Sequence, residues 1–136
     1  MMSTAKPVPP RPGHGAPRRR LEEILRVDHA GELAAVQIYK GQSMVFRETP
    51  KRALSEQFSH MQGEEQVHLD AFERLLRERQ VRPTAMTPVW RLAALGLGVG
   101  TALLGEKAAH ACTEAVEDVI ADHYAEQIAE LEALVQ

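Results

Sequence analysis

The chain is poor in cysteine, in aromatic residues and in patterns typical of β-strands. Cys112 is the single cysteine among 136 residues, which excludes an intramolecular disulfide framework and a cysteine-rich zinc or iron–sulfur site. Aromatic residues make up only 4% of the chain, and no stretch alternates apolar and polar residues as a half-buried strand does. This length fits one domain with one core. These features favour a reducing compartment and an all-α fold.

The first twenty residues lack acids and the apolar run of a secretory signal. They hold five prolines and five bases, and the bases are Lys6, Arg11, Arg18, Arg19 and Arg20. Of the 16 bases in the chain, 11 remain for residues 21–136, which carry all 19 acids and a net charge of −8. We therefore predict a disordered basic leader over residues 1–20 and one domain over residues 21–136. The prolines argue against an amphipathic mitochondrial transit peptide, the acidic domain argues against nucleic-acid binding, and the arginines suit anionic lipid.

From residue 21 onward, apolar residues recur at helical spacing in four stretches separated by proline or glycine. Pro50, Pro83 and Pro88 mark the joints. The stretches cover residues 21–47, 51–80, 89–105 and 107–136. Short joints between helices predict an antiparallel helical bundle.

The second stretch carries an apolar heptad seam that two ionisable residues interrupt. Its members follow one another at steps of 4 and 3: Leu54, Phe58, Met61, Glu65, His68, Phe72 and Leu75. Burying Glu65 and His68 costs several kcal/mol unless a partner compensates. Because they stand at i and i+3, both side chains can reach one metal ion. An E-x-x-H pair alone is also compatible with an ion pair or a surface-facing stretch, and the position in the seam favours a metal.

Acids also occupy the apolar stripes of the first and fourth stretches. One stripe passes through Leu25, Asp28, Glu32, Val36 and Tyr39, and the other through Thr113, Glu117, Ile120, Tyr124, Ile128 and Leu131. Gly31, beside Glu32, costs roughly 1 kcal/mol in a helix and suits close approach of another backbone or a ligand. Three inward acids and one histidine match the carboxylate-bridged di-iron design, although acids facing water remain the alternative. Carboxylates and imidazole favour iron over zinc.

Six sequence strings in this order resemble the demethoxyubiquinone hydroxylase family, which comprises ferritin-like di-iron monooxygenases of ubiquinone biosynthesis. The strings are R-V-D-H-A-G-E (26–32), I-Y-K-G-Q (38–42), E-x-x-H (65–68), V-R-P-T (81–84), G-T-A-L-L-G-E-K (100–107) and A-C-T-E-A-V-E (111–117). The resemblance implies that Glu32 and His68 bind one iron, that Glu65 bridges two irons and that Glu117 binds the second. It also implies that His123 and Tyr124 lie near the metals and the quinone pocket.

The same resemblance implies a substrate and a cellular setting. We expect hydroxylation of demethoxyubiquinol, a quinol with a polyprenyl tail, by O2 at two irons per chain. Expected partners are the membrane surface and a lipid-binding accessory protein of ubiquinone biosynthesis, with no nucleic acid. We expect a peripheral location on the cytoplasmic face of the bacterial cell membrane, with the mitochondrial inner membrane as the alternative.

The sequence departs from the family pattern at three places. Leu33 stands where the family usually has an aromatic residue, which predicts a changed pocket shape. His110 lies two helical turns, roughly 10.5 Å, from Glu117, so we expect a packed or partly exposed side chain rather than a ligand. The family's second E-x-x-H has no counterpart within residues 126–136, so we expect a C-terminally incomplete bundle with an incomplete second iron site. The alternative functions are a truncated, non-catalytic metal- or lipid-binding fragment and an iron-storing bundle.

The third stretch is apolar and rich in glycine. Residues 92–105 include no charge over 14 residues, which is too short to span a bilayer core of about 30 Å. Composition alone favours a buried core helix, whereas the family resemblance favours a helix that lies in the membrane surface. Trp90 and Arg91 at its start suit such an interface.

Overall fold

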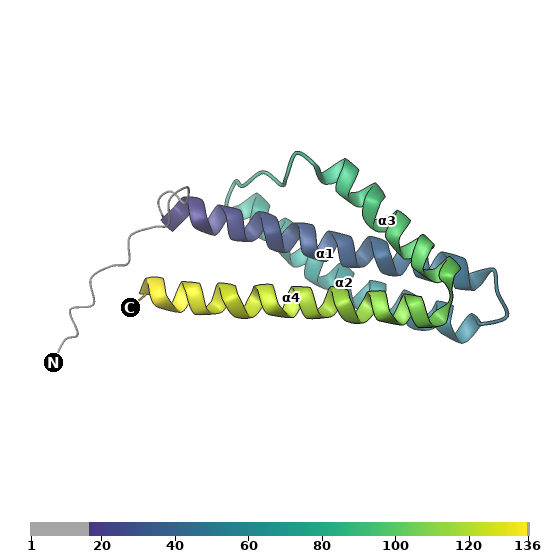
Figure 1. Cartoon of the computed structure of the whole chain (residues 1–136). Coiled ribbons are helices and arrows are strands. Elements are labelled where there is room, and N and C mark those ends of the chain that lie inside the picture. The colour runs from purple at the N-terminus through teal and green to yellow at the C-terminus, as the bar shows by residue number, and fades with distance from the viewer. Residues whose placement is uncertain (1–16, 136) are drawn as a thin grey trace.

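The computed structural model describes residues 17–135 and shows four α-helices and no strand within that range. The helices are α1 (Pro17–Arg47), α2 (Arg52–Glu78), α3 (Thr87–Leu104) and α4 (Glu106–Val135) (Figure 1). The predicted all-α class is confirmed, and three of the four stretches match their helices to within about two residues at each described end. Helix α4 follows α3 after Gly105 alone, whose φ of 121° lies in the left-handed region that favours glycine.

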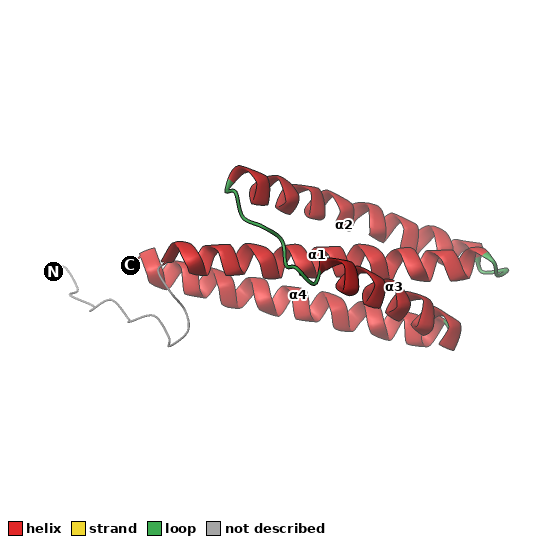
Figure 2. Cartoon of the chain, turned by 90° about the horizontal axis from the view of Figure 1, so that it is seen from above, coloured by secondary structure: helices red, strands yellow, loops and turns green. Residues whose placement is uncertain are grey.

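Helix α1 lies at the centre of the bundle and packs against the other three helices (Figures 1 and 2). Its apolar residues Ala34, Ala35, Ile38 and Tyr39 form a buried cluster with Ala94 of α3. Side chains of α2 and α4 pack against the same cluster; they are Met61, Cys112, Val116 and Ile120. Helix α1 therefore provides the surface on which residues of the other helices are brought together.

The start of α1 corrects the predicted leader. The helix begins at Pro17, so residues 17–20 belong to the bundle and the predicted boundary at residue 20 is wrong. Proline is tolerated in the first helical turn, because that turn's N–H groups have no intrahelical partner. Arg20 then binds Glu130 of α4 through two hydrogen bonds of 2.6 and 2.8 Å and Glu23 through one of 3.0 Å. The remainder of the predicted leader, residues 1–16, lies outside the described residues.

Helix α3 packs on α1 through a face of small residues. Ala94, Gly98 and Ala102 are its buried positions. A Cβ on Gly98 would lie 2.1 Å from the carbonyl oxygen of Ile38, so only glycine allows this approach of the two helices. Two hydrogen bonds hold the segment before and at the start of α3 against α1: Trp90 Nε1 donates to Ala30 O at 2.7 Å, and Arg26 Nε donates to Arg82 O at 2.9 Å.

The opposite face of α3 is apolar and exposed, so the interpretation of α3 as a buried core helix is wrong. Its large exposed side chains include Val89, Leu92, Leu97, Leu103 and Leu104. The helix spans 18 residues, four more than the charge-free stretch, and only 17% of it is buried. By length and composition it is the one helix within the described residues that could cross a membrane.

Candidate metal centre

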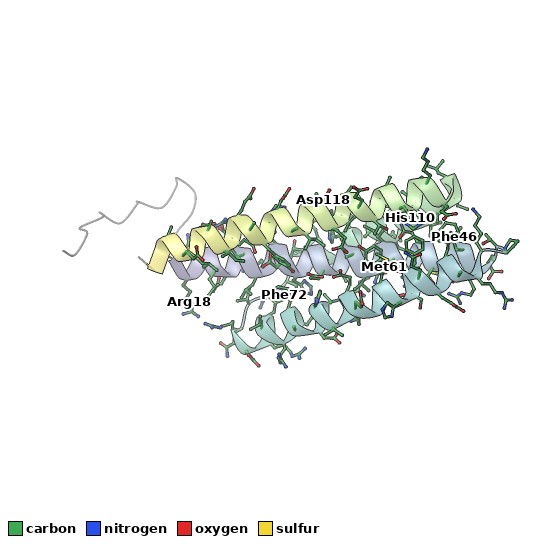
Figure 3. The ribbon with its side chains drawn as sticks, turned by 90° about the horizontal axis from the view of Figure 1, so that it is seen from below. Arg18, Phe46, Met61, Phe72, His110 and Asp118 are labelled. Carbon is green, nitrogen blue, oxygen red and sulfur yellow. The ribbon has the colours of Figure 1, made fainter. Side chains whose placement is uncertain are left out.

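Helices α1 and α2 bring three potential metal ligands together. Atoms of Glu32, Glu65 and His68 that could bind a metal ion all lie within 4.8 Å of one another. His68 Nδ1 is 3.3 Å from Glu65 Oε2 and 3.8 Å from Glu32 Oε2. Figure 3 labels Met61 and Phe72, which bracket this part of α2. The three ligands that the sequence predicts on α1 and α2 therefore converge in the structure.

The two carboxylates are buried, whereas the imidazole stands at the edge of the cluster. Glu32 is 1% exposed and Glu65 is 8% exposed, but the His68 side chain is 59% exposed. The heptad seam placed His68 inward, and that part of the prediction is wrong. The reason is that α2 and α4 have no direct backbone contact and meet through side chains, such as the stacked rings of Phe72 and Tyr124 at 6.3 Å. The open edge between the two helices leaves His68 accessible.

Glu65 carries the strongest electrostatic perturbation in the cluster. Burial, and after it the neighbouring acids Glu32 and Glu117, together raise the pKa of its carboxyl to about 9. Glu65 thus lies within reach of both other acids, and it holds a proton at neutral pH in the metal-free protein. This position between Glu32 and Glu117 is the one that a bridging carboxylate would need.

A divalent or trivalent cation fits the donors present. Glu32 Oε2 is buried without a hydrogen-bond partner, which is costly for a carboxylate oxygen. Loss of the Glu65 proton would place a third negative charge beside Glu32 and Glu117, and a cation would compensate that charge. Carboxylate oxygens and one imidazole nitrogen are donors that suit iron.

Two tyrosine hydroxyls bind the carboxylates of the cluster. Tyr124 of α4 donates a hydrogen bond to Glu32 Oε1, and Tyr39 of α1 donates one of 2.5 Å to Glu117 Oε1. Burial and the adjacent carboxylates raise the pKa of both phenols, so both remain protonated donors. In the sequence, Tyr39 stands out only as part of an apolar stripe. The signal that could have identified it is its hydroxyl, because a fully buried tyrosine needs a polar partner.

Of the predicted site residues on helix α4, only some approach the cluster of Glu32, Glu65 and His68. Glu117 is exposed, so its predicted inward position is wrong, and it is absent from the group of three converging ligands. Its carboxylate nevertheless approaches Glu65 and binds Tyr39. His123 is exposed and lies near Asp28, whose pKa it lowers while burial raises it more. The structure thus brings Tyr124 to the cluster, whereas His123 is exposed.

The predicted inward stripe of α4 is wrong at its C-terminal end. Ile128 is 57% exposed and Leu131 is 37% exposed, whereas Gln127 is buried. Gln127 forms a hydrogen bond with the buried carboxyl of Asp28, so a polar residue occupies the inward position next to Ile128.

The two remaining departures from the family pattern lie outside the cluster. His110 Nε2 is 3.7 Å from Glu106, and its ring lies 5.5 Å from that of Phe58, so the side chain is packed and partly exposed as expected. Figure 3 shows His110 with Phe46 at the end of the bundle remote from Arg18. Leu33 is buried among Val36 and Leu69.

An antiparallel bundle that gathers carboxylates and an imidazole on facing helices defines the class of ferritin-like proteins with a candidate carboxylate–histidine metal centre. The family description "ubiquinone biosynthesis protein COQ7" applies to a profile that matches residues 19–136. The chain belongs to this family, as the resemblance in its sequence strings predicted.

Individual relatives agree with this assignment. The chain is 47% identical over 116 residues to the 3-demethoxyubiquinol 3-hydroxylase of Rhodospirillum rubrum, covering 85% of this chain and 54% of the relative. It is 46% identical over 123 residues to a mitochondrial NADPH-dependent 3-demethoxyubiquinone 3-hydroxylase of Caenorhabditis elegans, covering 89% and 64%. It is 44% identical over 111 residues to the human protein of that name, covering 82% of this chain and 50% of the relative. The chain therefore spans about half of the length of the curated relatives it matches.

Proposed function

We propose that this chain forms the main part of the metal centre of a di-iron monooxygenase that hydroxylates the ring of demethoxyubiquinol in ubiquinone biosynthesis. The observation that carries the proposal is the convergence of Glu32, Glu65 and His68 within 4.8 Å in a member of this family. Bound iron would supply the redox chemistry that activates O2, while the protein supplies ligands, orientation and a dry environment.

Each acid has a role that follows from its position. Glu32 and His68 would hold the first iron and Glu117 the second, and Glu65, which lies between these two acids, would be shared by both. Glu65 would have to give up its carboxyl proton to hold a metal ion, because a coordinating carboxylate must be ionised. Tyr124 holds Glu32 through its hydroxyl, and the buried side chains around Glu32 exclude water from that carboxylate. We assign His123 a place beside the centre, next to Asp28.

The exposed face of α3 supports a location at a membrane surface. A long-tailed quinol is partitioned into lipid, and the leucines on this face provide apolar area that a bilayer surface would cover. We place the protein on the cytoplasmic face of a bacterial membrane, in line with its bacterial relative, and the mitochondrial names of other relatives support the inner mitochondrial membrane as the alternative. A lipid-binding accessory protein is the further partner we propose.

Iron uptake and oxygen insertion test the enzyme. Anaerobic titration of the purified chain with Fe²⁺ should show binding that the double variant E65A/H68A loses. The matched control is H60A/E64A, which removes an exposed pair on the same helix whose His60 Nε2 and Glu64 Oε1 atoms lie 3.0 Å apart. This control should bind Fe²⁺ as the wild type does. Reduced, iron-loaded protein should transfer one atom of ¹⁸O₂ to demethoxyubiquinol. Equal iron content in wild type and E65A/H68A would refute the centre, and iron uptake without oxygen transfer would favour a non-catalytic metal-binding fragment.

Flotation with liposomes tests the membrane location. The wild-type chain should float with vesicles that contain anionic lipid, and the variant L92S/L103S/L104S should not, because these three side chains are each more than 70% exposed on α3. The control variant V67S/V119S removes two exposed apolar side chains of α2 and α4 and should float normally. Equal flotation of all three proteins would contradict the proposed role of α3.

A further inference from the structure

The two tyrosines of the chain make a reciprocal pair of contacts between α1 and α4. Tyr39 of α1 donates to Glu117 of α4, and Tyr124 of α4 donates to Glu32 of α1. The sequence contains no other tyrosine. Each phenol is therefore used on an acid of the facing helix, and both acids flank Glu65.

These hydrogen bonds fix the directions of two carboxylates. A phenol O–H that donates to an ionised carboxylate forms a short, charge-assisted bond. Such a bond leaves the second oxygen free for another partner. For Glu32 that second oxygen, Oε2, is buried, has no hydrogen-bond partner and lies 3.8 Å from His68 Nδ1.

The two acids depend on their tyrosines to different degrees. Glu32 is buried in the core, so packing and the hydrogen bond from Tyr124 act together on its carboxylate. Glu117 belongs to an exposed position of α4, and the fully buried Tyr39 draws its carboxylate inward toward Glu65. Tyr39 thus determines whether the acid of α4 joins the acids of α1 and α2.

We propose that Tyr39 and Tyr124 are positioning residues, each of which prepares the carboxylate for a different metal ion: Tyr39 prepares Glu117 for the second ion and Tyr124 prepares Glu32 for the first. This inference rests on the proposed function in one respect, the assignment of Glu32 and Glu117 to two ions. Removing one hydroxyl should therefore affect one metal equivalent more than the other, which a general loss of packing would not do.

Metal titration of the tyrosine-to-phenylalanine variants tests the division of roles. Phenylalanine keeps the ring and removes only the donor, so we expect Y39F and Y124F to retain wild-type helicity by circular dichroism. In anaerobic Fe²⁺ titrations, Y39F should bind the second equivalent at least tenfold more weakly and the first within twofold of wild type, as expected for an outer hydrogen bond to a ligand. Y124F should weaken the first equivalent. Equal losses of both equivalents in Y39F, or none, would overturn the proposal.

A double-mutant comparison separates positioning from a structural role. If Tyr39 acts through Glu117, then Y39F should have no further effect on iron binding when it is added to E117Q. Additive losses in Y39F/E117Q would show that Tyr39 acts by another route. A visible iron(III)–phenolate absorption band after oxidation would show that a tyrosine is itself a ligand, which would also overturn the positioning role.

Carbon-13 NMR reads the tyrosine contacts without metal. Protein labelled at the tyrosine Cζ atoms should give two resonances, of which E117Q shifts the one that Y39F removes and E32Q shifts the one that Y124F removes. If E117Q leaves the Tyr39 resonance unshifted, the contact between Tyr39 and Glu117 is refuted, even if a variant disturbs folding. Absence of iron uptake by the wild type would refute the metal centre itself, whereas normal uptake with an unchanged Y39F titration would refute only the role of Tyr39.

Discussion

Replacing Gly98 by alanine should loosen α3 from α1, because the two backbones leave no room for a methyl group. The new Cβ would lie 2.1 Å from Ile38 O and 2.8 Å from Ile38 C. Carbon atoms in normal contact stay about 3.5 Å or more from their neighbours, so the helices would have to move apart by more than about 1 Å. The obstacle is main chain, which cannot rotate away as a side chain could.

The expected magnitude follows from two opposing effects. Alanine has a higher helix propensity than glycine and gains roughly 1 kcal/mol in a helix. Overpacking in a close interface typically costs about 1–3 kcal/mol, and the backbone clash at Gly98 places it at the upper end. G98A should therefore lower the free energy of unfolding by about 2 kcal/mol. G96A and G100A are matched controls in the same helix, and since neither new Cβ meets an atom within 4 Å, both should be more stable than wild type.

Urea unfolding followed by tryptophan fluorescence provides the assay. Trp90 is the single tryptophan, and its Nε1 donates to Ala30 O across the interface that G98A disturbs. Fluorescence of G98A should shift to the red at low urea, before the loss of helicity seen by circular dichroism. An unfolding midpoint of G98A at or above that of G96A would refute the close packing of α3 on α1.

Three further predictions concern Glu65 and Arg20. Because Glu65 is protonated below about pH 9, apparent Fe²⁺ affinity should rise with pH by up to tenfold per unit toward pH 9, and a flat titration profile would contradict this. Between its ordinary pKa and about 9, Glu65 is protonated in the folded chain and ionised in the unfolded chain. The free energy of unfolding of the metal-free chain should therefore fall as the pH rises through this range. E65Q should remove this slope in urea unfolding at several pH values. R20A should lower the free energy of unfolding by about 1 kcal/mol, because it removes the contact with Glu130. The control variant R18A changes a side chain that is 84% exposed and should alter the free energy of unfolding by less than about 0.5 kcal/mol. Equal effects of the two variants would argue against the contact.

The fold was predictable where it depends on local pattern. Apolar residues at helical spacing and the prolines between them located four helices, because both signals act within a few residues of chain. The start of α1 was missed because it depends on Arg20 reaching Glu130, a partner 110 residues away. No local pattern reports such a contact.

The candidate site was predictable to a similar depth. The stripes identified Glu32 and Glu65 as buried acids, because a charged residue in an apolar line is visible in the sequence. The exposure of His68 and the hydrogen-bond partner of Tyr39 depend instead on how α4 lies across α1. The residue pattern of a single helix does not report the spacing between two helices. For the same reason, the resemblance placed His123 near the metals without indicating that its side chain is exposed.

The side-chain-only contact between α2 and α4 has a consequence for the lifetime of the protein in the cell. Without a cation, Glu65 of α2 keeps its proton because Glu32 of α1 and Glu117 of α4 lie beside it. An ion that binds all three would couple the two helices, and at a free concentration 100 times its dissociation constant it would add about 2.7 kcal/mol to the folded state. A difference of that size changes how often a chain opens to proteases and therefore its steady-state abundance. We expect cells that are short of iron to hold less of this protein, even where its synthesis is unchanged.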